Sequence, residues 1–344
     1  MSKMHSPYTI QRETFDELNR FLYLSEIWSK IFDELLVDDI MRLSRTCRCL
    51  HGMAETYWNS HICLLRIIGP YVSSVVQIEE FREMMHMTGA IISGSSALQV
   101  FALAHYDESD LDLYVEASRS QIVSSFLINL GYSKLEMTIG TKDGLDPGDG
   151  YPGKTEIQQV ESYRKEGWNR IIQLINTVRE PVFAILQFHS SKSRSIILNI
   201  ANRNSTACVM NFITHTRAYS LYPYSTHCDR TTMVCGPTTS KIVYALKKYE
   251  EHGWMMINNL SIDMMFLHPK SEWNTKYRTI GDQYCWSRQI KLVNYAWLKD
   301  EFRLGSQFKW GIRFCKFPQY GDVLEGIMKP MEWVFTGRLE ITEE

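Results

Sequence analysis

Asp110 and Asp112 are the residues whose type and spacing most clearly suggest chemistry in this sequence. Residues 111–115 predict a short strand, in which side chains two positions apart share a face and lie roughly 6–7 Å apart. Two carboxylates on one face can share one or two Mg²⁺ ions, which also bind waters and substrate phosphates. Such ions activate an attacking oxygen and stabilise a leaving pyrophosphate. Alone the pair is a weak signal, because a solvated strand end has the same pattern.

A Gly-Ser turn ahead of this strand strengthens the interpretation. Residues 89–93 predict a short buried strand, Gly94, Ser95 and Ser96 predict a turn, and residues 97–103 predict a helix. The start of a helix offers free N–H groups and a positive dipole end to a phosphate. Gly94 lets the backbone come close, and Ser95 adds a hydroxyl donor. The two motifs together are more specific than either alone.

The passage GSSALQVFALAHYDESDLDLYV, which begins at Gly94, resembles the nucleotidyltransferase superfamily of the polymerase-beta type. The resemblance covers about residues 75–215. It implies a Mg²⁺–nucleotide site in which Asp110 and Asp112 are the catalytic metal ligands and Gly94 and Ser95 contact the phosphates. It also implies transfer of a nucleotidyl group to a hydroxyl, a phosphate or a protein side chain.

Two further features of that family are only partly present. Related enzymes often hold the triphosphate with basic residues on a later helix, so Lys241 is a candidate beside the alternative of a solvated charge. They also carry a third carboxylate on a strand beside the D-x-D strand, where residues 170–177 offer Gln173 and Asn176. An amide can ligate a metal through its oxygen but cannot act as a base. Glu156 and Glu161 are possible substitutes, and catalysis stays open.

The segment from Leu24 to Trp58 resembles an F-box, with Ser25 where that family usually has proline. Apolar residues recur there at helical spacing, which predicts two or three short helices, and Asp38 with Asp39 is expected to end the first and cap the second. The resemblance implies binding to a Skp-type adaptor of a ubiquitin ligase through an apolar helix face. The alternative is that these helices only pack on the core.

The combination is similar to an uncharacterised fungal family that pairs an F-box-like start with a nucleotidyltransferase-like core. That family supplies no activity to carry over. Two functions are therefore expected: a nucleotidyltransferase-like protein that binds Mg²⁺ and a nucleoside triphosphate, or an adaptor protein whose core is a scaffold without chemistry. Residues 191–205 interrupt the similarity, either as an insertion or as a gene-model artefact.

Periodicity predicts an α+β fold in three parts. Residues 1–70 form the F-box-like helices, residues 71–225 form a mixed sheet with flanking helices, and residues 226–344 form a mainly helical, aromatic-rich extension. Within the middle part we expect a hairpin around residues 165–167 and a helix that stops at Gly131.

Composition restricts the class of protein. The 344 residues are 44% hydrophobic and 22% charged, which is ordinary for a globular chain. A net charge of −2 gives no whole-molecule attraction to nucleic acid or membrane, although it hides local basic patches. No apolar stretch approaches the roughly 18 residues of a membrane span, and no signal peptide is visible. The eight cysteines form no C-x-x-C pair, which favours free thiols in the cytoplasm or nucleus.

Overall fold

A computed structural model shows a chain of mixed α+β class, as predicted. It describes residues 25–104, 106, 109–135, 157–188, 207–233, 240–257, 260–261, 272–273, 278–290, 309–315 and 327–336. Glu156 and the predicted insertion at 191–205 lie outside this part. The chain divides into an N-terminal unit, Met1–His61, and a core unit, Ile62–Glu344.

The N-terminal unit consists of three described helices: α2 (Ser25–Asp33), α3 (Val37–Ser44) and α4 (Arg48–His61). Phe32, Ile40 and Trp58 are fully buried, as the helical spacing of apolar residues requires. Asp38 and Asp39 do not cap α3. The N-cap residue is Leu36, and the two carboxylates lie in the first turn, where Arg42 pairs with both.

An eight-stranded sheet forms the centre of the core unit, in the order β12-β7-β6-β1-β2-β5-β4-β3. Its only parallel neighbours are β2 and β5, and every other pair is antiparallel. The strands are β1 (Ile91–Ser93), β2 (Leu111–Glu116), β3 (Tyr132–Lys134), β4 (Ile157–Lys165), β5 (Ile171–Thr177), β6 (Asn211–Ile213), β7 (Arg217–Ser220) and β12 (Trp286–Gln289).

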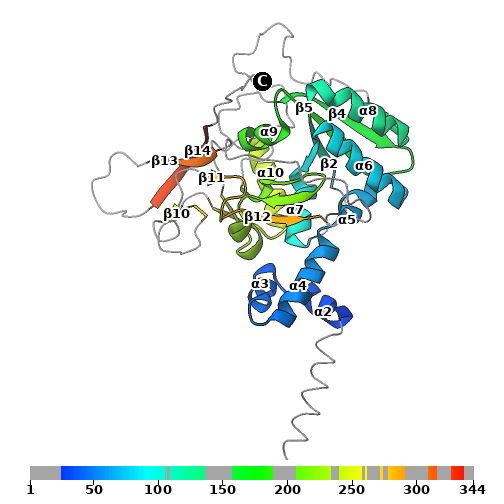
Figure 1. The fold of residues 1–344 in the computed structure, drawn as a ribbon. Coiled ribbons are helices and arrows are strands. Elements are labelled where there is room, and N and C mark those ends of the chain that lie inside the picture. Colours follow the sequence, from blue (N-terminus) through cyan, green and yellow to red (C-terminus); the bar gives the residue numbers. More distant parts are fainter. Residues whose placement is uncertain are drawn as a thin grey trace, which may run out of the picture. The chain divides into compact units, whose positions relative to one another are not determined.

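Helices lie against this sheet (Figure 1). They are α5 (Leu64–Ile68), α6 (Val75–Thr88), α7 (Gly94–Ala102), α8 (Ser120–Asn129), α9 (Pro181–Phe188) and α10 (Ser240–Glu251), with short turns η1 (Gly69–Tyr71), η2 (Ala117–Arg119), η4 (Ala207–Val209) and η5 (Tyr224–Cys228). The helix predicted from residue 119 corresponds to η2 and α8, and the chain leaves it at Gly131 with φ +89°, which suits glycine.

Register assigns the side chains of the sheet to two faces. Asp112 pairs with Gln173 and Tyr114 with Ile175, and we call their side the acidic face. There Tyr114 and Ile175 pack in one cluster with Phe183 of α9. The side chains of intervening residues point to the opposite face, called the back face.

The back face is covered by α6 and α8. The Tyr163 hydroxyl of β4 donates to Ser124 of α8 over 2.8 Å, and Phe126 of α8 meets Phe81 of α6 edge to face. The carboxylates of Asp110 and Asp112 can therefore reach solvent only on the acidic face.

The C-terminal region differs from the prediction. Within its described residues from 226 onward, one α-helix, α10, accompanies seven strands rather than a mainly helical fold. Aromatic and β-branched side chains fit a pleated surface well, which favours strands such as WGIRFC and MEWVFT. The strands outside the main sheet are β8 (Thr231–Met233), β9 (Met255–Ile257), β10 (Leu260–Ser261), β11 (Arg278–Thr279), β13 (Lys309–Cys315) and β14 (Ile327–Thr336).

No single helix in the described residues is long and apolar enough to cross a membrane. One bent pair, Arg48–Tyr71 with Val75–Thr88, meets the length and composition requirement when both members are taken together.

Candidate functional site

The start of α7 lies directly against the D-x-D strand. Gly94 follows β1 and begins the helix with φ +69°, so the predicted Gly-Ser turn is the helix's first turn. A Cβ on Gly94 would overlap a carboxylate oxygen of Asp112 and lie 3.0 Å from its Cγ. Because Gly94 has no side chain, the N-terminus of α7 can lie in contact with the Asp112 carboxylate.

Asp110 and Asp112 point to the same face, as their spacing predicts. Asp112 is aligned with Ser93 on one side and Gln173 on the other. An oxygen of the Asp110 carboxylate accepts a hydrogen bond of 2.8 Å from Nε2 of Gln173. Both aspartates are partly exposed. The acidic face thus holds two carboxylates and one amide in a single group.

Gln173 occupies the position where the resemblance places a third carboxylate. Of the other suggested residues, Asn176 and Glu161 do not reach the group, and Glu156 lies outside the described residues. Asn176, three positions further along β5, is buried on the back face. Glu161 is aligned with Leu174 on the back face, where it accepts from the Tyr163 hydroxyl at 2.7 Å and pairs with Lys134 at 3.0 Å. Glu161 is therefore ruled out as a substitute ligand.

The hydroxyl of Ser95 is part of a hydrogen-bonded group that the sequence did not reveal. It lies 3.0 Å from Oγ of Ser109, and Gln99 donates through Nε2 to that same Ser109 oxygen at 2.8 Å. Gln99 also donates to the carbonyl of Ser95. Gln99 is one turn after Ser95 on α7, but its link to Ser109 is a tertiary contact. Ser95 is thus oriented beside the acidic pair.

Further contacts fix the chain that leads into β2. Ser96 donates to the carbonyl of Asp110 at 2.8 Å, and Gln99 accepts from the N–H of Tyr106 at 2.7 Å. The Tyr71 hydroxyl donates to the carbonyl of Ser109 at 2.6 Å. Asp110 is therefore held through its backbone from two sides, by α7 and by the turn that contains Tyr71.

Two tyrosines close to Asp112 are buried. Burial raises the pKa of Tyr114, and the charge of Asp112 raises it further. Burial likewise raises the pKa of Tyr249 on α10, with a smaller contribution from Asp112 among others. In such surroundings charges interact more strongly than in water. Helix α10 therefore passes close to the site, but the side chain of Lys241 lies outside the described residues.

Asp110 and Asp112 suit a single metal ion with open coordination positions better than an ion bound entirely by protein side chains. No group of three or more His, Cys, Asp or Glu side chains gathers anywhere in the described part of the chain. Mg²⁺ is commonly bound by one or two carboxylates that leave positions for water and phosphate oxygens. Asp110 and Asp112 could hold Mg²⁺ in this way, where the ion would bridge the protein and a phosphate.

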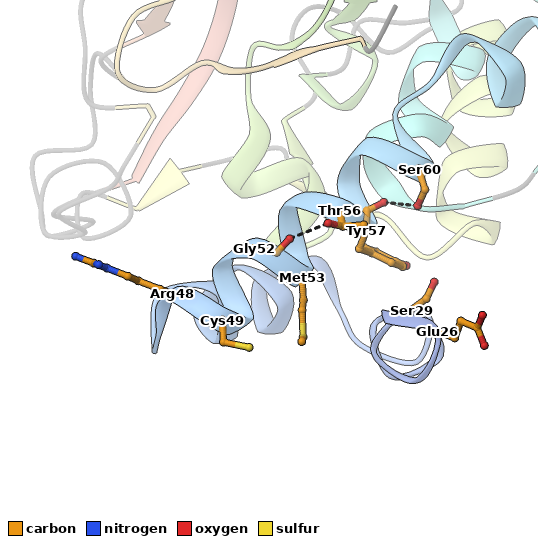
Figure 2. A pocket seen from close by; sticks show the side chains of 9 residues that line it. All are labelled: Glu26, Ser29, Arg48, Cys49, Gly52, Met53, Thr56, Tyr57 and Ser60. Carbon is orange, nitrogen blue, oxygen red and sulfur yellow. Dashed lines mark hydrogen bonds between the residues drawn. The ribbon is translucent and has the colours of Figure 1, made fainter. Parts of the chain in front are cut away.

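The N-terminal unit carries a separate groove between α2 and α4, with a volume of about 530 Å³ (Figure 2). On α2, on α3 and in the turn between them, Ile27, Ile31, Leu35 and Leu43 are only partly buried, and Leu36 is 54% exposed. The groove is lined by Glu26, Ser29, Arg48, Cys49, Gly52, Met53, Thr56, Tyr57 and Ser60. This unit therefore leaves apolar surface accessible.

The chain has no match among protein-family models, curated proteins or solved structures. The acidic face and the N-terminal groove are the two surfaces on which its function has to be inferred.

Proposed function

We propose that the core unit binds a Mg²⁺–nucleoside triphosphate on the acidic face and does not turn it over. The observation that carries this proposal is the 2.8 Å hydrogen bond from Gln173 to Asp110, at the place where an active nucleotidyltransferase needs a third carboxylate. Among the described residues, the acidic face has groups that would bind Mg²⁺–nucleotide and no third carboxylate that would activate it.

Binding is supported by the contact between Gly94 and Asp112. The N-terminus of α7 presents backbone N–H groups and a positive dipole end, which favour phosphate. A cation held by Asp112 and Asp110 would lie beside those N–H groups, so it could contact the same phosphates. Ser95, oriented by Ser109 and Gln99, adds a hydroxyl.

The lack of turnover follows from the chemistry of an amide. Gln173 is neutral, so it neither accepts a proton from an attacking hydroxyl nor adds negative charge for a second ion. Nε2 of Gln173 also donates a hydrogen bond to one carboxylate oxygen of Asp110. A nucleotide held here would therefore keep its phosphates.

Thermal unfolding with each nucleoside triphosphate, with and without Mg²⁺, tests binding. A ligand that binds only the native state stabilises it by about 2.7 kcal/mol at 100 times its Kd. We expect Mg²⁺-dependent stabilisation that Asp110→Asn/Asp112→Asn abolishes. Glu116→Gln is the matched control, because Glu116 is a partly exposed acid at the other end of β2. No stabilisation by any nucleotide would refute binding.

Pyrophosphate release, measured with mixed RNA and protein acceptors, tests the second half of the proposal. We expect none from the wild-type chain under conditions where nucleotide is bound. Release that depends on Asp110 and Asp112 would show an active enzyme instead.

A second candidate function is supported by the partly exposed apolar residues of α2 and α3. They would let the N-terminal unit dock on a Skp-type ubiquitin-ligase adaptor, with the core unit presenting a target. Co-purification with the adaptor tests this, and Ile31→Asp/Leu35→Asp should abolish it. Lys30→Asp is the control, since that position is already exposed and polar. A wild-type chain that does not associate would rule out this function.

A further inference from the structure

The turn between β4 and β5 is a tight, well-defined structure at one end of the sheet. The N–H of Trp168 donates to the carbonyl of Lys165 over 3.0 Å, and Gly167 between them has φ +76°. A Cβ at Gly167 would meet nothing within 4 Å, so the turn faces open space. A large ligand could therefore approach the turn at Gly167.

Three basic residues gather at this turn. Arg164 is exposed, and Lys165 and Arg170 are partly exposed. None of them forms an ion pair within the described residues. Glu166 is the one acid in the turn, so the local charge is positive although the whole chain is slightly acidic.

Aromatic rings hold two of these cations in place. The Lys165 ammonium lies 5.0 Å from the centre of the Trp168 ring and 3.1 Å from Oγ of Ser73. The Arg170 guanidinium lies 5.6 Å from the centre of the Tyr71 ring. The Arg170 guanidinium also hydrogen-bonds to the Tyr71 side chain, and its remaining N–H groups are left for an anion.

The turn is at the same end of the sheet as the acidic pair. Arg170 directly precedes β5, and Gln173, which bonds to Asp110, lies about 10 Å further along the strand at the usual rise per residue. Tyr71, under Arg170, donates to the carbonyl next to Asp110. The aspartates belong to the β2 segment, which lies between β1 and β5 in the sheet. The N-terminus of α7 follows β1 on one side of them, and the β4–β5 turn leads into β5 on the other side.

We propose that Arg164, Lys165, Trp168 and Arg170, called the basic turn, bind single-stranded nucleic acid, with its backbone phosphates on the cations and one base against Trp168. The inference rests on the proposed function in one respect, since it places this strand beside the bound nucleotide. Stacking on an aromatic ring needs an unpaired base, and basic groups interleaved with an aromatic residue are typical of single-strand binding. A duplex offers the turn phosphates but no free base.

Fluorescence anisotropy of a labelled 12-nucleotide single strand, with the full chain, tests the proposal. With about three phosphate contacts, the slope of log affinity against log salt should be about −2. Arg164→Gln and Arg170→Gln should each make this slope shallower by about 0.7. Trp168→Ala should weaken binding at least roughly fivefold.

Two controls separate the basic turn from general charge effects. Arg66→Gln removes an exposed arginine of α5 and should leave affinity and slope unchanged. Glu166→Gln removes the acid of the turn and should strengthen binding. Inorganic polyphosphate that competes as well as the single strand, with no loss on Trp168→Ala, would overturn the proposal in favour of a simple anion site.

Failure of this proposal is distinguishable from failure of nucleotide binding. Asp110→Asn/Asp112→Asn should remove stabilisation by Mg²⁺–nucleotide and retain single-strand binding, whereas Arg164→Gln should weaken single-strand binding and leave stabilisation by Mg²⁺–nucleotide unchanged. Absence of single-strand binding by the wild-type chain, or binding untouched by all three basic-turn substitutions, overturns the inference and leaves the nucleotide site standing.

Discussion

Gly94→Ala is the substitution that most directly tests the geometry of the acidic face. Two costs add at this position. An L-residue at φ +69° is in the left-handed region, which costs roughly 1–2 kcal/mol. The new Cβ would also overlap the carboxylate of Asp112, and forcing an atom into a packed contact costs about 1–3 kcal/mol. We expect a loss of about 2–5 kcal/mol in the free energy of unfolding.

Gly281→Ala separates these two costs. Gly281 has φ +83°, but a Cβ there would meet nothing within 4 Å. This control should therefore lose only the backbone part, roughly 1–2 kcal/mol. The difference between the two variants measures the overlap with Asp112.

A double-mutant cycle completes the test. In urea unfolding, Gly94→Ala/Asp112→Ala should regain about 1–3 kcal/mol relative to the sum of the single changes, because the overlapping carboxylate is gone. Equal costs for Gly94→Ala and Gly281→Ala, with an additive double variant, would refute the contact on which the nucleotide site is built. Gly94→Ala should also abolish stabilisation by Mg²⁺–nucleotide.

Three other predictions concern Gln173 and the C-terminal region. Gln173→Asp places a carboxylate beside Asp110. With Mg²⁺, nucleotide and the mixed RNA and protein acceptors, the nucleotidyl group should then pass to an acceptor and pyrophosphate should leave, detected by a coupled assay. Burial raises the pKa of Glu272 to about 7 from its usual 4.5. The stability from this group is full below pH 4.5 and is lost as the pH rises through 7. As the pH rises from 4.5 to 8, the free energy of unfolding of the wild type should therefore fall by about 3 kcal/mol relative to that of Glu272→Gln, measured by urea unfolding. Arg278, 1% exposed, pairs with Asp282 at 2.7 Å. Asp282→Asn should cost about 3 kcal/mol, equally at 0.15 and 1 M salt, because a buried pair is poorly screened.

The parts of the site that depend on local pattern could be predicted from the sequence. Alternation in a strand places Asp110 and Asp112 on one face whatever surrounds them. The Gly-Ser motif identified a helix start, although α7 begins at Gly94 rather than three residues later. The resemblance suggested both Gln173 and Asn176, and the register aligns Gln173 with Asp112.

The parts that depend on register and tertiary contact could not be predicted. Whether Glu161 faces the aspartates depends on how β4 pairs with β5, and the register that pairs it with Leu174 sends it to the back face. Nothing in the spacing of Gln99 and Ser109 shows that their side chains meet. In the C-terminal region, irregularly spaced aromatic residues gave no period to separate strand from helix.

The last strand of the main sheet is β12, whose residues Trp286–Gln289 pair with Arg217–Ser220 of β7. During synthesis, β7 leaves the ribosome well before its outer neighbour exists. At 5–20 residues per second, its hydrogen-bonding edge stays open for several seconds. An unpaired edge is a template for pairing with other chains. A chain that ends before residue 286 would keep the β7 edge unpaired, so we expect such fragments to aggregate more readily than fragments that extend through Gln289.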